Sequence, residues 1–183
     1  MNIIVTGSCG FIGFHLTNAL IGKGHTVIGI DNLNDYYDQK LKHDRKKNLL
    51  KLAEYIHYDS DIVLIENLKH IFSSHKPEIV FNMCAQAGVR YSLSNPDEYI
   101  NTNILGYHNI LKLSQANEVK HLIYASSSSV YGNINNIPLK ESSITDHPLS
   151  VYAATKKTNE LLSNAYSNLY GLRCTGIRFF TVY

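Results

Sequence analysis

The stretch "NIIVTGSCGFIG", residues 2–13, decides the fold of this chain. An apolar run of strand length leads into a turn with three glycines, Gly7, Gly10 and Gly13, and a helical pattern follows. A glycine-rich turn between a strand and a helix lets backbone N–H groups approach a pyrophosphate closely. The spacing is GxxGxxG rather than the GxGxxG of the dehydrogenase fingerprint, so an ordinary tight turn is the alternative interpretation.

Apolar runs of strand length recur along the chain, and stretches long enough for helices separate them. Strands are predicted at 2–6, 26–30, 78–83, 121–126 and 174–180, with a further candidate at 54–62. Helical patterns fit 11–22, 64–75, 97–117 and 150–170. This alternation predicts an α/β fold, a doubly wound parallel sheet of the Rossmann type with right-handed crossovers.

The most basic stretch is "KLKHDRKKNLLK", residues 40–51. It suits either a phosphate-binding patch or the solvated face of an amphipathic helix. The interleaved Leu41, Leu49 and Leu50 favour the helix.

Composition excludes several classes of protein. The chain has 183 residues, 44% of them apolar, and a net charge of +2, which indicates a globular domain rather than a disordered chain or a nucleic-acid binder. No apolar run is long enough for a membrane helix, and no charged leader precedes the first apolar run, so we expect a cytoplasmic protein. The three cysteines and nine histidines show no metal-binding spacing, so neither a metal site nor a disulfide is expected.

Asp31 ends the second predicted strand, 24 residues after Gly7. A carboxylate there can accept hydrogen bonds from both ribose hydroxyls of an adenosine and would repel a 2′-phosphate, which favours NAD over NADP. Alone, Asp31 would be read as a helix cap or turn residue. Asp61 and Ile62 follow the next strand candidate, where they could hold the adenine amino group or form a surface turn.

Tyr152 and Lys156, in "VYAATKK", are four residues apart and share one helix face. A lysine ammonium beside a tyrosine favours the phenolate, which makes the phenol a usable base. The serine run in "IYASSSSVYG", residues 123–132, follows a predicted strand, at the end where doubly wound sheets bind ligands. The alternative interpretation of the serine run is a flexible linker, and that of Tyr152 and Lys156 is a chance pair on a helix surface. Together with the glycine turn, these residues predict hydride exchange between a carbinol carbon and nicotinamide.

Seven motifs carry a family resemblance that covers essentially the whole chain: "TGSCGFIG", "DNLNDYYD", "AQAGVRYS", "NTNILGYHN", "SSSVYG", "YAATKK" and "RFFTVY". In this order they resemble the extended short-chain dehydrogenase/reductase superfamily, and within it the NAD-dependent nucleotide-sugar 4-epimerases. "AQAGVRYS" and "RFFTVY" are most similar to UDP-glucuronate 4-epimerases, including those of capsule and lipopolysaccharide synthesis.

The resemblance implies roles for individual residues. Tyr152 matches the catalytic base, Lys156 its pKa modulator and ribose ligand, and Ser127 the serine that orients the sugar 4-hydroxyl. The positions that match NAD-binding residues are Gly7, Gly10, Phe11, Ile12, Gly13, Asp31, Asn32, Asp61, Ile62, Ala85, Tyr152, Lys156 and Phe180. The candidate substrate contacts are Arg90, Ser127, Ser129, Tyr152 and Thr181.

Some of these positions keep a structural alternative. Arg90 suits an anionic part of the sugar nucleotide or pairing with a structural carboxylate. Asn103 fits an asparagine near the active site or a residue that packs two helices together. Ser126 is expected to be structural. At Asn82 and Cys84 the family more often has His and Ala, which leaves the local ribose contacts open.

Departures from related enzymes narrow the reaction class. Where this chain has Ser128 and Ser129, the 4,6-dehydratases that share the framework carry an Asp-Glu pair and the decarboxylases a Glu. Elimination of water after oxidation needs a second proton donor and acceptor, and serine hydroxyls are poor substitutes. The resemblance therefore implies epimerisation by transient oxidation at C4, in which NAD is regenerated in each cycle.

The resemblance also implies a smaller C-terminal substrate domain. We expect residues 1–183 to form an NAD-binding Rossmann domain truncated before that domain, so that this chain alone would epimerise poorly. Homodimerisation through residues 97–117 and 150–170 is expected. The alternatives are an epimerase for UDP-glucose or UDP-N-acetylglucosamine, another NAD-dependent epimerase or dehydratase, a non-catalytic NAD-binding module and a pure interaction fragment.

Overall fold

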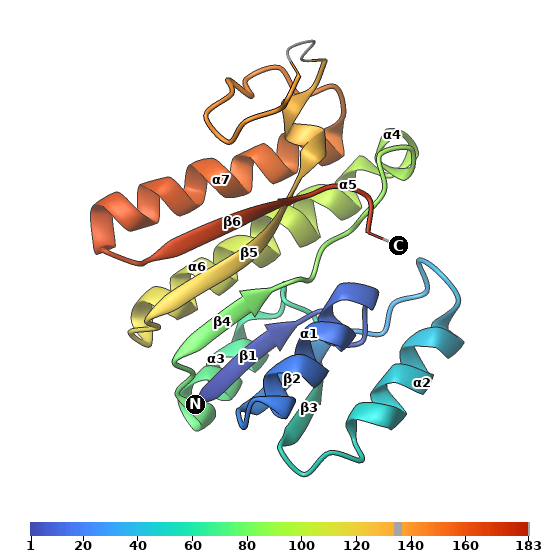
Figure 1. The fold of residues 1–183 in the computed structure, drawn as a ribbon, viewed down its shortest axis with the longest axis vertical. Coiled ribbons are helices and arrows are strands. Elements are labelled where there is room, and N and C mark those ends of the chain that lie inside the picture. The colour runs from blue at the N-terminus through green and yellow to red at the C-terminus, as the bar shows by residue number, and fades with distance from the viewer. Residues whose placement is uncertain (134–136, 183) are drawn as a thin grey trace.

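The computed structural model describes residues 1–133 and 137–182, which form one parallel sheet with helices on both faces (Figure 1). The six strands follow the order β3-β2-β1-β4-β5-β6, and every neighbouring pair is parallel. The strands are β1 (Asn2–Thr6), β2 (Thr26–Asp31), β3 (Tyr55–Asp59), β4 (Ile79–Asn82), β5 (His121–Ser127) and β6 (Cys174–Phe179). The predicted doubly wound sheet is confirmed, including the strand candidate at 54–62.

The central strand β1 shows why the sheet needs two helical layers. Ile3 and Val5 are buried in one apolar cluster, whereas Ile4 is buried in the other. Successive side chains of a strand point to opposite faces, so an apolar run must be covered on both sides. Helices α1 (Phe11–Gly22) and α2 (Gln39–Leu49) cover the first face, and α3 (Ile65–His75), α6 (Tyr107–Ala116) and α7 (Val151–Tyr170) the second.

The helix predicted at 97–117 is not one continuous α-helix. Two short helices, α4 (Tyr91–Ser94) and α5 (Pro96–Tyr99), lead into a π-helix, η1 (Ile100–Gly106), before α6 begins. Proline at the first position of α5 fits a helix start, because its missing N–H would have no partner there. The helical segment predicted at 97–117 is confirmed, with the π-helix η1 inside it, and wider helical turns of this kind often occur at functional sites.

Helix α2 corresponds to the basic stretch, and its N-terminus is capped by the Asp38 side chain, which accepts a hydrogen bond from Lys40 N at 2.9 Å. Of the three leucines expected on its apolar face, only Leu49 is buried, while Lys42 is buried instead. The helix itself is confirmed, but its predicted apolar face is only partly correct. Within the described part of the chain, no helix combines the length and apolar character needed to cross a membrane.

Candidate active site

The glycine turn forms a tightly packed backbone cradle between β1 and α1. Gly7 has a φ of +69°, and a Cβ atom there would lie 2.8 Å from the backbone nitrogen of Cys84. A Cβ atom on Gly13 would lie 2.0 Å from the carbonyl oxygen of Gly7. Gly10 precedes α1 in extended conformation and supplies no side-chain cap, so the first N–H groups of this helix remain available to an anion.

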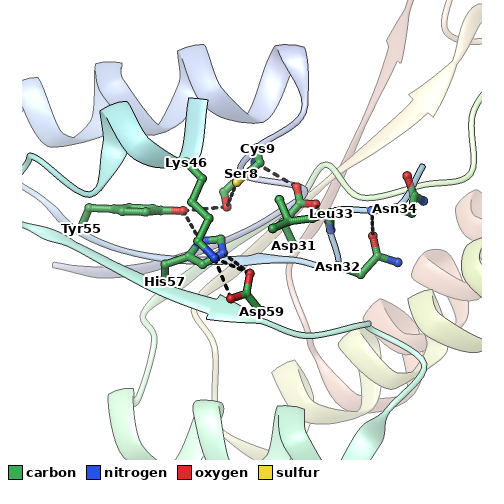
Figure 2. Close-up of polar contacts among 10 residues, drawn as sticks. All are labelled: Ser8, Cys9, Asp31, Asn32, Leu33, Asn34, Lys46, Tyr55, His57 and Asp59. Carbon is green, nitrogen blue, oxygen red and sulfur yellow. Dashed lines mark hydrogen bonds and ion pairs between the residues drawn. The ribbon is translucent and has the colours of Figure 1, made fainter. Parts of the chain in front are cut away.

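Asp31 supports this turn directly. Its carboxylate is 6% exposed and accepts hydrogen bonds from Cys9 N and Leu33 N, both at 2.9 Å (Figure 2). Each carboxylate oxygen has further lone pairs, so these bonds leave room for contacts with ribose hydroxyls. Asp31 therefore holds the turn in place, a role that the sequence did not reveal, and its role as a ribose ligand stays a prediction.

The ends of β2 and β3 are tied together beside Asp31. Asn32 Nδ2 donates to Asp61 Oδ2 at 2.7 Å, and Asp61 Oδ1 accepts from Val63 N at 2.9 Å. Ile62 is buried in the core, and its carbonyl accepts from Asn109 Nδ2 at 3.0 Å. Asn32 and Asp61 are thus joined by a hydrogen bond, whereas Ile62 is packed in the core and bonded to Asn109 of α6.

A cleft of about 560 Å³ opens at the carboxyl ends of the central strands, between the glycine turn and α7. The predicted site residues that line it are Gly7, Gly10, Phe11, Ile12, Gly13, Ala85, Ser127, Tyr152, Lys156 and Phe180. The structure therefore brings the glycine cradle and the predicted catalytic residues to one cleft. Asp31, Asn32, Asp61, Ile62, Arg90, Ser129 and Thr181 lie outside its lining.

Tyr152 and Lys156 lie in the first two turns of α7. The helix is capped by Ser150, whose hydroxyl accepts from Ala153 N at 3.0 Å. Lys156 is 2% exposed, and its ammonium donates to the Ala125 carbonyl at 2.8 Å. Burial lowers the pKa of Lys156 to about 8.

Burial also raises the pKa of the Tyr152 phenol, and the neighbouring Ser127 hydroxyl opposes this shift. The Lys156 ammonium lies 6.0 Å from the centre of the Tyr152 ring. Burial therefore determines the direction of the shift in the free chain, and the lowering of the phenol pKa by Lys156 stays a prediction.

The serine run is a hydrogen-bonded end of β5 and not a linker. Ser127 Oγ accepts from Ser129 N at 3.2 Å and from Ser129 Oγ at 2.8 Å, which starts a 3₁₀-helix, η2 (Ser128–Tyr131). Ser126 instead donates to Glu160 of α7 at 2.6 Å. Ser126 and Ser127 thus both line the cleft, Ser126 is in addition held by Glu160, and Ser129 is linked to the cleft through Ser127.

The remaining predicted substrate residues are exposed and do not line the cleft. Arg90 is exposed just before α4, and Thr181 is exposed after β6. Phe180 is 61% exposed, and its ring stacks on Tyr131 with the ring centres 6.4 Å apart. Tyr183, the last residue of "RFFTVY", lies outside the described residues. The roles of Arg90 and Thr181 stay predictions.

Three cleft residues come from the α2 region and were missed: Tyr37, Leu41 and Arg45. Arg45 Nη1 donates to the Cys9 carbonyl at 3.3 Å and to the Tyr37 hydroxyl at 3.1 Å, and its guanidinium lies 5.8 Å from the centre of the Phe11 ring. Leu41 and Arg45 belong to the basic stretch, and its phosphate-binding interpretation stays a prediction. Sequence alone did not identify which basic side chain of residues 40–51 lines the cleft.

Asn103 holds the loop after β4 against α7. Its Oδ1 accepts from Gln86 N at 2.8 Å, and its Nδ2 donates to the Gln86 carbonyl at 3.0 Å and to Thr155 Oγ1 at 3.1 Å. These contacts agree with the interpretation of Asn103 as a packing residue. Gln86 Nε2 is buried with no hydrogen-bond partner among the described residues.

Residues 3–183 match the sequence model of the NAD dependent epimerase/dehydratase family. The chain belongs to this family. Membership confirms the resemblance seen in the motifs and NAD as the expected cofactor.

Individual members of the family are similar over the whole chain. Protein CapI of Staphylococcus aureus is 52% identical over 186 residues, which cover 100% of this chain and 54% of CapI. A UDP-glucuronic acid 4-epimerase from Bacillus cereus, solved with UDP-glucuronic acid and NAD, is 30% identical with a TM-score of 0.93 and is 57% covered. A UDP-glucose 4-epimerase from Thermotoga maritima, solved with UDP-glucose, is 36% identical with a TM-score of 0.90 and is 56% covered. Each structural alignment covers 100% of this chain, which thus spans about half the length of these relatives.

Proposed function

We propose that the protein to which this chain belongs is a nucleotide-sugar 4-epimerase that interconverts UDP-glucuronate and UDP-galacturonate with enzyme-bound NAD. The observation that carries the proposal is the cleft in which the glycine cradle meets Ser127, Tyr152 and Lys156. A dinucleotide and a sugar hydroxyl can both reach such a cleft, which lies where doubly wound sheets bind their ligands.

The residues around the cradle fit a dinucleotide. Side chains are excluded at Gly7 and Gly13, so a pyrophosphate can approach the backbone at the N-terminus of α1. Arg45 adds a positive charge beside Cys9 and Phe11, which suits the two phosphate groups. Asp31 disfavours a 2′-phosphate, so NAD is preferred over NADP.

Tyr152 is the proposed proton carrier. Bound NAD would supply reversible hydride acceptance at C4 of the sugar. In its phenolate form, the oxygen of Tyr152 takes the proton of the sugar 4-hydroxyl and becomes a phenol, and it returns this proton after the 4-keto sugar has turned its other face to the cofactor. Ser127 orients the sugar 4-hydroxyl, and the ammonium of Lys156, 6.0 Å from the centre of the Tyr152 ring, adds positive charge near the phenol and holds a ribose.

The cleft favours epimerisation over dehydration. Among the described residues, its lining contains no Asp or Glu side chain. Loss of water from the sugar would need a further proton donor and acceptor besides Tyr152. Ser128 and Ser129, at the start of η2, carry no carboxyl group with which to do this.

The uronate substrate is the finer part of the proposal. It is supported by "AQAGVRYS" and "RFFTVY", and by relatives named for UDP-glucuronate. Arg90 and Thr181 would contact the anionic part of the sugar nucleotide. Relatives named for UDP-glucose keep UDP-glucose as the alternative substrate.

Assembly and location complete the proposal. Helices α6 and α7 pack against each other through the Tyr166 hydroxyl and His108 Nε2, 3.0 Å apart, and leave Leu161 exposed on α7. An exposed leucine on this helix pair supports a homodimer built on it. The proposed setting is the cytoplasm, in the synthesis of capsule or lipopolysaccharide.

The test is a substrate panel on the full-length protein: UDP-glucuronate, UDP-glucose and UDP-N-acetylglucosamine, with products separated by chromatography. Epimerisation of UDP-glucuronate alone is the expected result. Preferential turnover of UDP-glucose would overturn the uronate assignment, and bound NAD with no turnover of any of the three sugars would favour a non-catalytic NAD-binding module.

A further inference from the structure

A chain of buried polar side chains runs from the glycine turn to β3, and no step described above uses it. Ser8 Oγ lies 2.9 Å from the Tyr55 hydroxyl, which lies 2.7 Å from His57 Nδ1. His57 Nε2 lies 3.0 Å from Asp59 Oδ1, and Asp59 pairs with Lys46 of α2 at 2.6 Å (Figure 2). The chain thus links the turn to an ion pair at the molecular surface.

The fold provides space for this chain. Tyr55, His57 and Asp59 are two residues apart on β3, so their side chains share one face of the strand. A Cβ atom on Gly29 of β2 would lie 2.2 Å from the Tyr55 hydroxyl and 2.6 Å from Ser8 Oγ. The absence of a side chain at Gly29 therefore makes room for the contact between the turn and β3.

The protonation state of His57 fixes the direction of these hydrogen bonds. In the neutral imidazole, Nε2–H donates to Asp59 and Nδ1 accepts from Tyr55, whose oxygen then accepts from Ser8. An imidazolium has no acceptor nitrogen, so Tyr55 must turn its proton toward Ser8. Among the described residues, the remaining partner of the Ser8 hydroxyl is then Cys9 Sγ at 4.0 Å, which is a weak acceptor.

We propose that His57 is a positioning residue of the cofactor turn: through Tyr55 it fixes Ser8 and Cys9, and its protonation weakens NAD binding. The inference rests on the proposed NAD site. Cys9 connects the hydrogen-bonded chain to that site, because Cys9 N donates to Asp31 and the Cys9 carbonyl accepts from Arg45 of the cleft. A shift of this turn would therefore move both the acidic and the basic residue expected to hold the cofactor.

The groups around His57 keep it neutral at neutral pH. Burial lowers its pKa, the hydrogen bond to Asp59 raises it, Lys46 of α2 lowers it, and Asp31 of β2 raises it. Burial also raises the pKa of Tyr55, so this phenol stays protonated throughout. His57 consequently becomes charged only below the usual imidazole pKa of about 6.5.

A second tyrosine–histidine pair on the same strand provides a matched control. The Tyr58 hydroxyl lies 2.8 Å from Nε2 of His75, the last residue of α3. Tyr58 packs against the opposite apolar cluster from Tyr55, so this pair does not reach the glycine turn. Burial also lowers the pKa of His75, which makes the two imidazoles comparable.

The experiment measures NAD affinity by titration from about pH 8 to about pH 5.5, across the usual imidazole pKa. It uses the full-length protein freed of bound nucleotide and its variants His57→Gln, Tyr55→Phe and His75→Gln, with folding checked by circular dichroism. A glutamine amide can accept from Tyr55 and donate to Asp59, but it does not titrate.

We expect the unaltered chain to lose affinity about threefold to tenfold as the pH falls, the effect of one hydrogen bond. His57→Gln should keep the NAD affinity of neutral pH and lose this pH dependence. Tyr55→Phe should bind NAD more weakly at every pH, and His75→Gln should behave like the unaltered chain.

Two outcomes would overturn the inference and leave NAD binding itself standing: the same pH dependence in His57→Gln, or the loss of this pH dependence in His75→Gln. No NAD binding by the unaltered chain at about pH 8 would overturn the proposed function along with it.

Discussion

At the scale of single residues, burial acts on Tyr152 and Lys156 in opposite directions. It raises the pKa of the phenol and lowers that of the ammonium to about 8, because burial disfavours the charged form of each group. Tyr152 is therefore protonated in the free chain at neutral pH. A positively charged group bound in the cleft would lower the phenol pKa. We therefore expect the Tyr152 phenolate to form only when the cofactor is bound.

Gly13 and Gly22 test the cradle, since both belong to α1 but have different surroundings. An alanine Cβ at Gly13 would collide with the Gly7 carbonyl oxygen, 2.0 Å away, whereas at Gly22 it would meet nothing within 4 Å. Gly13→Ala should lower the free energy of unfolding by about 2 kcal/mol, as overpacking does. It should also abolish NAD binding, measured by titration.

Gly22→Ala is the matched control. It should leave NAD affinity unchanged and raise the free energy of unfolding by about 0.5 kcal/mol, because alanine favours helix more than glycine does. Equal NAD affinities in the two variants would contradict the assignment of the cradle.

At the scale of elements, signals that are local in sequence predicted local structure well. The strand predicted at 2–6 and the helix at 11–22 have the predicted bounds, because a β-branched run and three glycines in a required turn determine them. The helix predicted at 97–117 is also present, but the sequence did not predict its π-helical segment, η1. Asn103 pairs with the backbone of Gln86, 17 residues earlier in the chain, and no helical periodicity reports such a contact.

Asn103 provides a test of this element. Asn103→Ala removes the side chain that holds the Gln86 backbone, so the free energy of unfolding should fall by about 2 kcal/mol, the cost of unsatisfied buried polar groups. Hydrogen exchange at the Gln86 amide should become faster. The control is Asn101→Ala, on the exposed face of η1, which should change neither quantity. Unchanged exchange at Gln86 in Asn103→Ala would contradict the role given to Asn103.

At the scale of the whole molecule, the parallel sheet gathers residues that are distant in sequence. Motif order predicted that the turn after β1, the serine run after β5 and the tyrosine of α7 would meet, because ligands bind at the carboxyl ends of parallel strands. Arg45 and the chain from Ser8 to Asp59 could not be predicted in this way. Both depend on how side chains of α2 and β3 pack against the glycine turn, which a single sequence does not report.

The central claim is that Tyr152 carries the proton of a 4-epimerisation in the NAD cleft. The most direct test measures turnover of UDP-glucuronate by the full-length protein and its Tyr152→Phe variant, with bound NAD quantified in the same samples. Tyr166→Phe, which alters another tyrosine of α7 that contacts His108, is the control. We predict that Tyr152→Phe loses turnover by at least about 100-fold with unchanged NAD content, the scale of a lost general base, while Tyr166→Phe stays active. Full turnover by Tyr152→Phe would contradict the account.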